Sequence, residues 1–154
     1  GTTFFVDIPY LIGTASVRDT ASVDCSAING RRIMVVDDVA INTTITCRLL
    51  ERHGAVVDCA ENGREAGELF RSKPDYYYDC ILMDIQMPVL DGYNATSNIR
   101  RMDDKAKASI PIVAMTANAF AEDREKALSV GMNDHIAKPV DMSKLIPTIR
   151  KYIK

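Results

Sequence analysis

Short apolar runs alternate with longer amphipathic segments along most of the chain. Unbroken apolar runs occur at 33–36, 80–83 and 112–115, and two weaker stretches with the same character occur at 56–60, interrupted by Asp58, and at 135–137, which begins with His135. Apolar runs of this length predict buried strands, and strands that are apolar on both faces are typical of a parallel sheet covered by helices on both sides. The pattern therefore predicts five strands, each followed by a helix.

The segment after the first run shows the spacing of an amphipathic helix. Ile41, Ile45 and Leu49 recur at intervals of one helical turn within 39–53, and Gly54 is a typical residue for the end of a helix. We therefore expect a helix whose apolar stripe packs on the sheet.

Signals for later helices are equally local. Asn62, with Glu65 three residues further on, is typical of a helix N-terminus. Two more helices are expected over about 93–102 and 121–130. Each of these segments follows a predicted strand, as a β–α unit requires.

The last predicted helix contains a proline. Asp141 is its expected N-cap, and Pro147 falls beyond the first turn, where proline removes a hydrogen bond and crowds the preceding turn. Its apolar side consists of Met142, Leu145, Ile149 and Ile153. This stripe favours docking on the sheet, so we expect the helix to persist with a local bend.

Five successive β–α units predict an α/β fold of three layers, with an open, doubly wound parallel sheet at its centre. Connections between parallel strands are right-handed, and ligands of such sheets bind at the carboxyl ends of the strands. The residues that directly follow each strand are therefore the candidates for chemistry.

Composition changes near residue 30. The segment 11–30 is rich in Ser, Thr and Ala and lacks the periodicity of either helix or strand, which is typical of a linker. We therefore expect the domain itself to occupy 31–154. The chain begins with Gly rather than Met, as expected for an excised fragment.

Overall composition excludes several classes of protein. The 19 basic and 21 acidic residues give a net charge of −2, which argues against a nucleic-acid surface. Because 47% of the residues are hydrophobic, we do not expect a disordered chain. The sequence shows neither a signal peptide nor an apolar run long enough for a membrane helix, which favours a cytoplasmic location. The four cysteines lack zinc-ligand spacing and are expected to be buried and reduced.

Polar residues follow four of the five predicted strands. They are Asp37 and Asp38, Asp84, Thr116, and Lys138. Two like charges about 4 Å apart repel by roughly 4 kcal/mol at an effective dielectric of 20, so the three carboxylates require cations. Lys138 supplies one charge, and a hard ion such as Mg²⁺, which favours carboxylate oxygens, supplies two more. Such a set suggests phosphoryl chemistry; the alternative for each acid, such as Asp38, is that it only caps the next helix.

At these strand ends the sequence resembles the receiver domains of two-component response regulators. The matching stretches are IMVVDD at 33–38, ILMDIQMPVLDG at 81–92, VAMTANA at 113–119 and HIAKPV at 135–140. The resemblance implies a flavodoxin-like fold with the strand order 2-1-3-4-5.

The resemblance also implies how the acidic residues act. Asp84 is expected to accept a phosphoryl group from a phosphohistidine on a histidine kinase domain, which is the donor. Asp37, Asp38 and Asp84 are expected to hold Mg²⁺ together with the backbone carbonyl of Gln86. The signal would then pass to a histidine phosphotransfer protein or into a conformational switch. A receiver of this kind assists its own phosphorylation and dephosphorylation.

The remaining matched positions are expected to sense the phosphoryl group. Thr116 would bond to it after a small inward movement, and Lys138 would pair with its oxygens. Pro139 is expected to follow a cis peptide bond. His135 stands where receivers usually place an aromatic switch residue, which is a departure from the family pattern. The small side chain of Ala117 would leave the phosphoryl group accessible.

The first ten residues suggest the context of the domain. GTTFFVDIPY at 1–10 resembles the closing strand of the ATP-binding domain of sensor histidine kinases. A remnant of that domain, a linker and a receiver in this order imply a hybrid histidine kinase, whose parent chain could be membrane-anchored. The 154 residues lack the kinase core, so we do not expect them to bind ATP.

Two other functions share parts of this pattern. Haloacid-dehalogenase-like phosphatases also use an aspartyl phosphate with Mg²⁺, but their nucleophile lies in a D-x-D motif after the first strand, where this chain has Asp37-Asp38-Val39. A flavodoxin-like module that binds a nucleotide needs a loop there that attracts phosphate, and two carboxylates repel it. Both alternatives therefore fit less well than a receiver.

Overall fold

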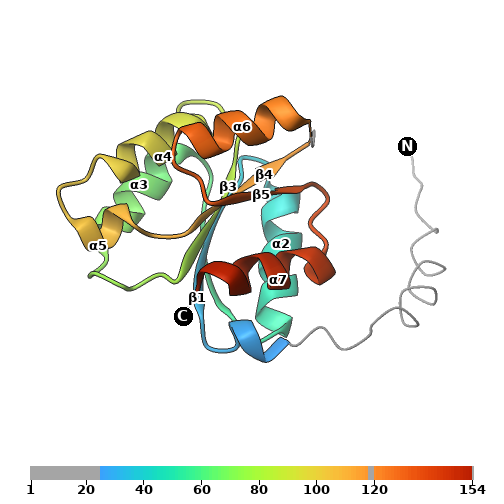
Figure 1. Ribbon diagram of the computed structural model, residues 1–154. Helices are drawn as coiled ribbons and strands as arrows, with labels where there is room; N and C mark the ends of the chain where they lie inside the picture. The colour runs from blue at the N-terminus through green and yellow to red at the C-terminus, as the bar shows by residue number, and fades with distance from the viewer. Residues whose placement is uncertain (1–24, 118–119, 154) are drawn as a thin grey trace.

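A five-stranded parallel sheet lies at the centre of the structure, a computed structural model that describes residues 25–117 and 120–153 (Figure 1). Its strands are β1 (Arg32–Val36), β2 (Val56–Ala60), β3 (Cys80–Asp84), β4 (Ile112–Thr116) and β5 (Asp134–Ala137). All neighbouring pairs are parallel, in the order β2-β1-β3-β4-β5. The predicted fold class and strand order are confirmed.

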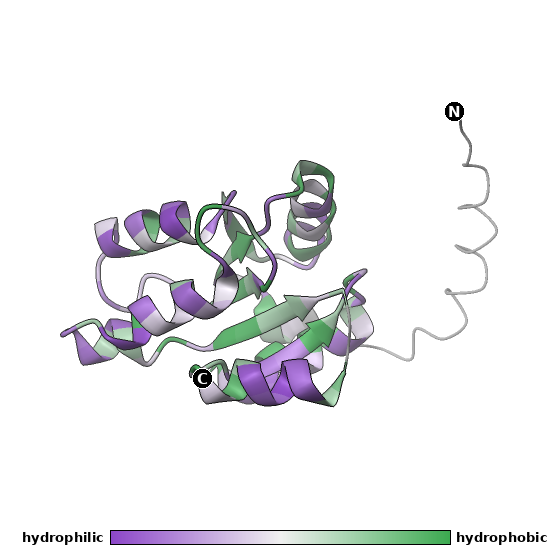
Figure 2. Cartoon of the chain, turned by 90° about the horizontal axis from the view of Figure 1, so that it is seen from above, coloured by the Kyte–Doolittle hydropathy of each residue, from purple (hydrophilic) through white to green (hydrophobic). Residues whose placement is uncertain are grey.

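Helices cover both faces of the sheet, as the apolar strands required. They are η1 (Cys25–Ile28), α2 (Ala40–Arg52), α3 (Gly63–Ser72), α4 (Gly92–Arg100), α5 (Lys105–Ala108), α6 (Ala121–Ser129) and α7 (Met142–Tyr152). On β1, Met34 and Val36 pack toward α3, α4 and α6, whereas Ile33 and Val35 pack toward η1, α2 and α7. Figure 2 shows the strands mostly in the hydrophobic colour and hydrophilic residues on the surrounding helices.

Two helix starts lie where the sequence predicted them. The Asn62 side chain accepts a hydrogen bond of 2.9 Å from the backbone N–H of Glu65 at the start of α3. Asp141 caps α7 in the same way, through the backbone N–H of Ser143. Helix α7 persists across Pro147, as expected. The local bend at that proline stays a prediction.

The side of α2 that was expected to pack on the sheet is mostly exposed. Ile41 is 67% exposed and Ile45 is 51% exposed, and the buried residues of this helix are instead Thr46, Cys47 and Leu50. The periodicity was correct for a helix, but it did not identify the buried side. The two isoleucines near the start of α2 therefore lie on the surface.

The structure adds two short elements that the sequence pattern did not reveal. The 3-10 helix η1 falls within the segment 11–30 expected to be a linker, and its Ile28 is completely buried in the core. Helix α5 begins after Asp104, which accepts hydrogen bonds from the backbone N–H groups of Ala106 and Lys107. The predicted remnant 1–10 and the linker up to residue 24 lie outside the described residues.

Two further sequence expectations can be compared with the described part of the chain. None of its helices is both long and apolar enough to cross a membrane. Cys47 and Cys80 are buried, as expected, whereas Cys59 is exposed. Burial of all cysteines was therefore a wrong expectation.

Candidate functional site

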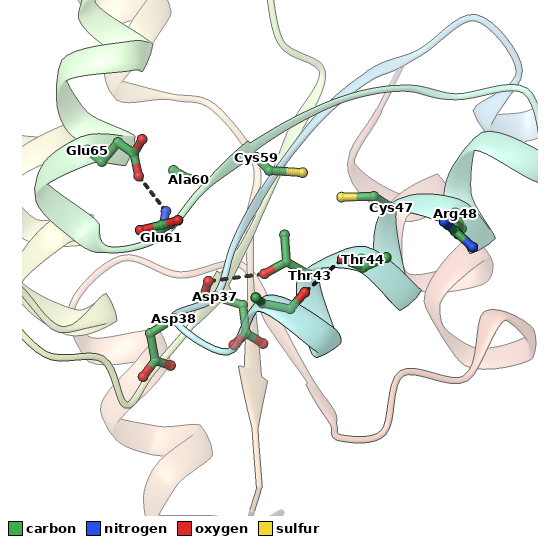
Figure 3. A pocket seen from close by; sticks show the side chains of 11 residues that line it. Asp37, Asp38, Thr43, Thr44, Cys47, Arg48, Cys59, Ala60, Glu61 and Glu65 are labelled. Atoms are coloured by element: carbon green, nitrogen blue, oxygen red, sulfur yellow. Dashed lines mark hydrogen bonds between the residues drawn. The ribbon is translucent and has the colours of Figure 1, made fainter.

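Three carboxylates lie together where β1 and β3 end. One oxygen from each of Asp37, Asp38 and Asp84 can be chosen so that all lie within 4.8 Å of one another. Asp37 and Asp84 are buried, and Asp38 is exposed on the same loop as Asp37 (Figure 3). Asp38 does not cap α2, because the N-cap of that helix is Val39, whose own side chain makes no capping hydrogen bond. The capping alternative for Asp38 is therefore wrong.

Lys138 joins two of these carboxylates. Its Nζ lies 2.8 Å from Asp37 Oδ2 and 2.9 Å from Asp84 Oδ2. Burial raises the pKa of Asp84 against the lowering effect of Lys138. Burial alone would lower the pKa of Lys138, but hydrogen bonds to Asp37 and Asp84 raise it, so the ammonium group stays charged. One cation thus offsets part of the repulsion among three acids.

Backbone contacts hold the carboxylates in place. Asp37 Oδ1 accepts a 2.9 Å hydrogen bond from the N–H of Val39, and the hydroxyl of Thr43 donates to the Asp37 carbonyl over 3.1 Å (Figure 3). Asp84 Oδ1 accepts a 3.2 Å bond from the N–H of Gln86. Thr43 was not predicted from the sequence, because only the fold shows that the first turn of α2 contacts the residue that follows β1.

Gly92 shapes the loop behind Asp84. A Cβ atom at Gly92 would collide with the carbonyl oxygen of Asp84, and the N–H of Gly92 donates to the Ile85 carbonyl over 3.0 Å. Glycine is the residue that permits such a close backbone approach. The loop from β3 to α4 therefore folds tightly against the end of β3, which fixes the backbone of Asp84.

Thr116 and Lys138 are brought together by pairing of β4 with the end of β5. Thr116 is buried, and its carbonyl accepts a 2.8 Å hydrogen bond from the N–H of Lys138. The Lys138–Pro139 peptide bond is cis, which agrees with the expectation from the resemblance. The structure thus gathers residues from all four strand ends that the sequence singled out.

His135 lies on β5 beside Ala114 of β4. Its Nδ1 is 3.7 Å from Asp134 Oδ1 and has no hydrogen-bond partner in the described part of the chain. The side chain is 23% exposed. Its place two residues before the end of β5 does not put it among the carboxylates, so a switching role remains a prediction.

The chemistry of this site follows from its donor atoms. Carboxylate oxygens are hard ligands, so a cluster of three carboxylates suits a small divalent cation such as Mg²⁺ better than a soft metal ion. A buried carboxylate beside a fixed ammonium group can also act as a nucleophile toward an electrophile that carries negative charge, because the ammonium group stabilises that charge. Both properties suit phosphoryl transfer.

Comparison with known proteins shows the same family over most of the chain. The family model for the response regulator receiver domain matches residues 33–150. Hybrid signal transduction histidine kinase B of Dictyostelium discoideum is 40% identical over 79% of this chain and 7% of its own length. Two-component system protein A of Emericella nidulans is 38% identical over 94% of this chain and 20% of its own length. The chain thus spans a small part of these relatives.

Solved structures show the same fold. The receiver domain of a sensor histidine kinase from Pseudomonas aeruginosa, solved with magnesium in its active-site cleft, has a TM-score of 0.71 and 37% identity, covering 80% of this chain and 97% of that chain. The receiver domain of the Saccharomyces cerevisiae regulator Ssk1, solved with the histidine phosphotransfer protein Ypd1, has a TM-score of 0.70 and 30% identity, covering 81% of this chain and 90% of that chain. Given the sheet order, the strand-end cluster and these matches, the chain belongs to the response regulator receiver domains of two-component signalling.

Proposed function

We propose that Asp84 accepts a phosphoryl group from a phosphohistidine of a partner protein, as one step of a phosphorelay. The observation that carries this proposal is the bridging position of Lys138, whose ammonium group contacts both Asp37 and Asp84. That position holds a positive charge next to the nucleophile before a phosphoryl group arrives. Asp84 also lies at the carboxyl end of the central strand β3, which is the edge where ligands of such sheets bind.

Transfer forms one bond and breaks another. A carboxylate oxygen of Asp84 attacks the phosphorus, the bond from phosphorus to the imidazole nitrogen breaks, and the histidine leaves. Lys138 turns toward the oxygens of the phosphoryl group, and Thr116 donates its hydroxyl to one of them. We assign the metal ligands to Asp37, Asp38, Asp84 and the Gln86 carbonyl. When bound, Mg²⁺ neutralises part of the charge on the transferred group.

We also propose that this receiver belongs to a hybrid histidine kinase. The similarity to hybrid signal transduction histidine kinase B of Dictyostelium discoideum supports this proposal. The interpretation of residues 1–10 as the last strand of a kinase ATP-binding domain, followed by a linker over 11–30, is part of the same proposal. The cytoplasmic location expected for the receiver stays part of this proposal.

The partner surface we propose is the carboxyl edge of the sheet. Among the residues that the structure describes, five large apolar side chains are exposed there, which are Val39, Ile41, Ile45, Val89 and Phe120. They lie at the start of α2 and along it, on the loop after β3 and at the start of α6, around the carboxylate cluster. The solved complex of the Ssk1 receiver with a histidine phosphotransfer protein supports a phosphotransfer protein as the occupant. Such a partner would cover these side chains while presenting its histidine to Asp84.

Phosphotransfer from a labelled histidine phosphotransfer protein tests this proposal. The wild-type protein should take up the label in the presence of Mg²⁺. The variant Asp84→Asn should take up none. The double variant Ile41→Ser/Ile45→Ser should accept the label at least tenfold more slowly from the protein donor and at the wild-type rate from a small acyl phosphate. Leu128→Ser is the matched control, because Leu128 is exposed near the far end of α6. Unchanged labelling of Asp84→Asn would contradict the assignment of the acceptor.

A further inference from the structure

Two cysteines face each other across a cavity beside the carboxylate cluster. The cavity has a volume of about 480 Å³ and lies between α2 and the strand β2. Cys47 of α2 and Cys59 of β2 both line it, and Figure 3 shows their sulfur atoms pointing toward one another. No bond joins them, since both are free thiols. They are twelve positions apart in the sequence and are brought together only because α2 packs on β2.

The two thiols differ in environment. Cys59 is exposed on the edge strand β2, whereas Cys47 lies on the buried side of α2. Burial raises the pKa of Cys47 well above its usual value, and a hydrogen bond with Cys59 and the negative charge of Glu51 add to the effect. Cys47 therefore stays a protonated thiol, and Cys59 is the sulfur that an oxidant in solution meets first.

A third cysteine provides a contrast within the same molecule. Cys80 is completely buried on the central strand β3, and burial raises its pKa to about 12. It does not line the cavity that contains the pair. An oxidant that enters this cavity reaches Cys59 and Cys47, whereas Cys80 is protected for as long as the domain stays folded.

We propose that Cys47 and Cys59 form a reversible intramolecular disulfide when the domain meets a peroxide. The thiol of Cys59 takes an oxygen atom from the peroxide and becomes a sulfenic acid, with release of water when the oxidant is hydrogen peroxide. The sulfur of Cys47 then attacks the Cys59 sulfur, the S–O bond breaks, and the Cys47 proton passes to the departing hydroxyl, which leaves as a second water as the disulfide forms. The cysteines lose two electrons in total, and the peroxide gains them.

The bond would join α2 to β2 across the cavity, which Asp37 and Asp38 also line. Thr43, one turn before Cys47 on α2, donates to the Asp37 carbonyl, so α2 is also in contact with the metal-binding loop. A crosslink that closes a short loop of chain restricts the unfolded state. The oxidised domain should therefore resist unfolding better than the reduced domain, whether or not it can be phosphorylated.

Mass spectrometry after peroxide treatment tests the proposal. The reduced protein is treated at low concentration with hydrogen peroxide, remaining thiols are blocked with N-ethylmaleimide, and the chain is digested with trypsin without reduction. We expect a loss of about 2 Da and a crosslink between the peptides 33–48 and 53–64, which contain Cys47 and Cys59. Cys80 should remain a thiol. The melting temperature should rise by roughly 5 °C and return after dithiothreitol.

Two variants complete the experiment. Cys59→Ser should form no crosslink and show no rise in melting temperature, because the first reactive sulfur is gone. Cys25→Ser keeps the pair and should behave as the wild type, which makes it the matched control. The proposal would be overturned by a Cys59 that oxidises to sulfinic acid while Cys47 stays free, by a crosslink of either cysteine to Cys25 or to a second chain, or by two thiols that stay unoxidised.

Discussion

At the scale of single residues, the site depends on a balance of charge around Lys138. Its ammonium group lies within 2.9 Å of two buried carboxylates, and Asp38 adds a third acid that faces solvent. Asp37 and Asp84 are only 2% and 4% exposed, so water can screen them poorly. One lysine neutralises only part of the negative charge of the three carboxylates, so the site favours binding of a divalent cation.

Replacing that lysine should expose the repulsion among the acids. In Lys138→Ala, with the metal removed by a chelator, we expect the free energy of unfolding to fall by about 3 kcal/mol, because two buried carboxylates lose their partner. Millimolar Mg²⁺ should restore part of the loss. Urea denaturation with and without Mg²⁺ measures both effects. Lys105→Ala, on the short helix α5, is the control, and an equal loss in both variants would contradict this account of the charge balance.

Most site residues could be predicted from the sequence because they directly follow apolar runs. Asp37, Asp84 and Lys138 lie where strand ends of a parallel sheet must meet. Thr43 and Gly92 could not be found in this way. Their roles are contacts with the backbone of Asp37 and Asp84, and such contacts depend on how a helix or loop returns to the sheet.

At the scale of elements, periodicity predicted helices better than it predicted their buried sides. The Ile41 and Ile45 stripe on α2 is exposed, and Cys47 and Leu50 pack on the sheet instead. Hydrophobic spacing alone does not distinguish a stripe that packs inward from one that can meet a partner. Helix α5 was missed because four residues carry too little periodicity.

The contacts that Arg100 makes with the end of α5 and with the segment after α6 leave no local sequence signal. Arg100 at the end of α4 donates to the Ala108 carbonyl over 2.7 Å, to the Gly131 carbonyl over 2.8 Å, and to Asn133 Oδ1 over 3.0 Å. One guanidinium group thus joins α4 to the ends of α5 and α6. A single arginine in a sequence does not reveal which carbonyls it will reach.

The cap of α7 should contribute stability that depends on pH. Hydrogen bonds from the Ser143 hydroxyl and N–H lower the pKa of Asp141, so the charged cap stabilises the fold above the usual pKa of about 3.9 and loses that effect as the pH falls through the lowered value. Asp141→Ala should reduce the free energy of unfolding at pH 7 by about 1 kcal/mol. Asp141→Asn keeps a capping oxygen without the charge. The difference in the free energy of unfolding between Asp141→Asn and the wild type, measured by urea denaturation, should therefore shrink in acid. A difference that stays constant with pH would argue against the charge effect.

Phosphorylation should change the packing of α6, β5 and α7. Thr116 at the end of β4 pairs with Ala137, and His135 lies beside Ala114, so we expect a movement of Thr116 to displace β5. With beryllofluoride and Mg²⁺, we expect amide chemical-shift changes in 120–136 and little change in η1. Shifts that spare 120–136 would refute the coupling and the proposed switch role of His135.

At the scale of the whole molecule, Mg²⁺ should stabilise the folded domain. An unfolded chain does not assemble the three carboxylates, so binding favours the native state. At ten times its dissociation constant, the ion should add about 1.4 kcal/mol and raise the melting temperature by roughly 3–6 °C. Asp38→Ala should remove this shift while the fold survives, because Asp38 is exposed; Asp103→Ala, an exposed acid outside the site, should keep it. A melting temperature that ignores Mg²⁺ in the wild type would count against the site.

The central claim is that Asp84 is the phosphoryl acceptor, and intact-mass spectrometry tests it most directly. After incubation with Mg²⁺ and a small acyl phosphate, the wild type should gain a single adduct of about 80 Da that a chelator prevents. Reduction with borohydride followed by peptide fragmentation should locate the adduct at Asp84, and Asp84→Asn should show none. An undiminished adduct in Asp84→Asn, or a wild-type adduct located at another residue, would contradict the claim.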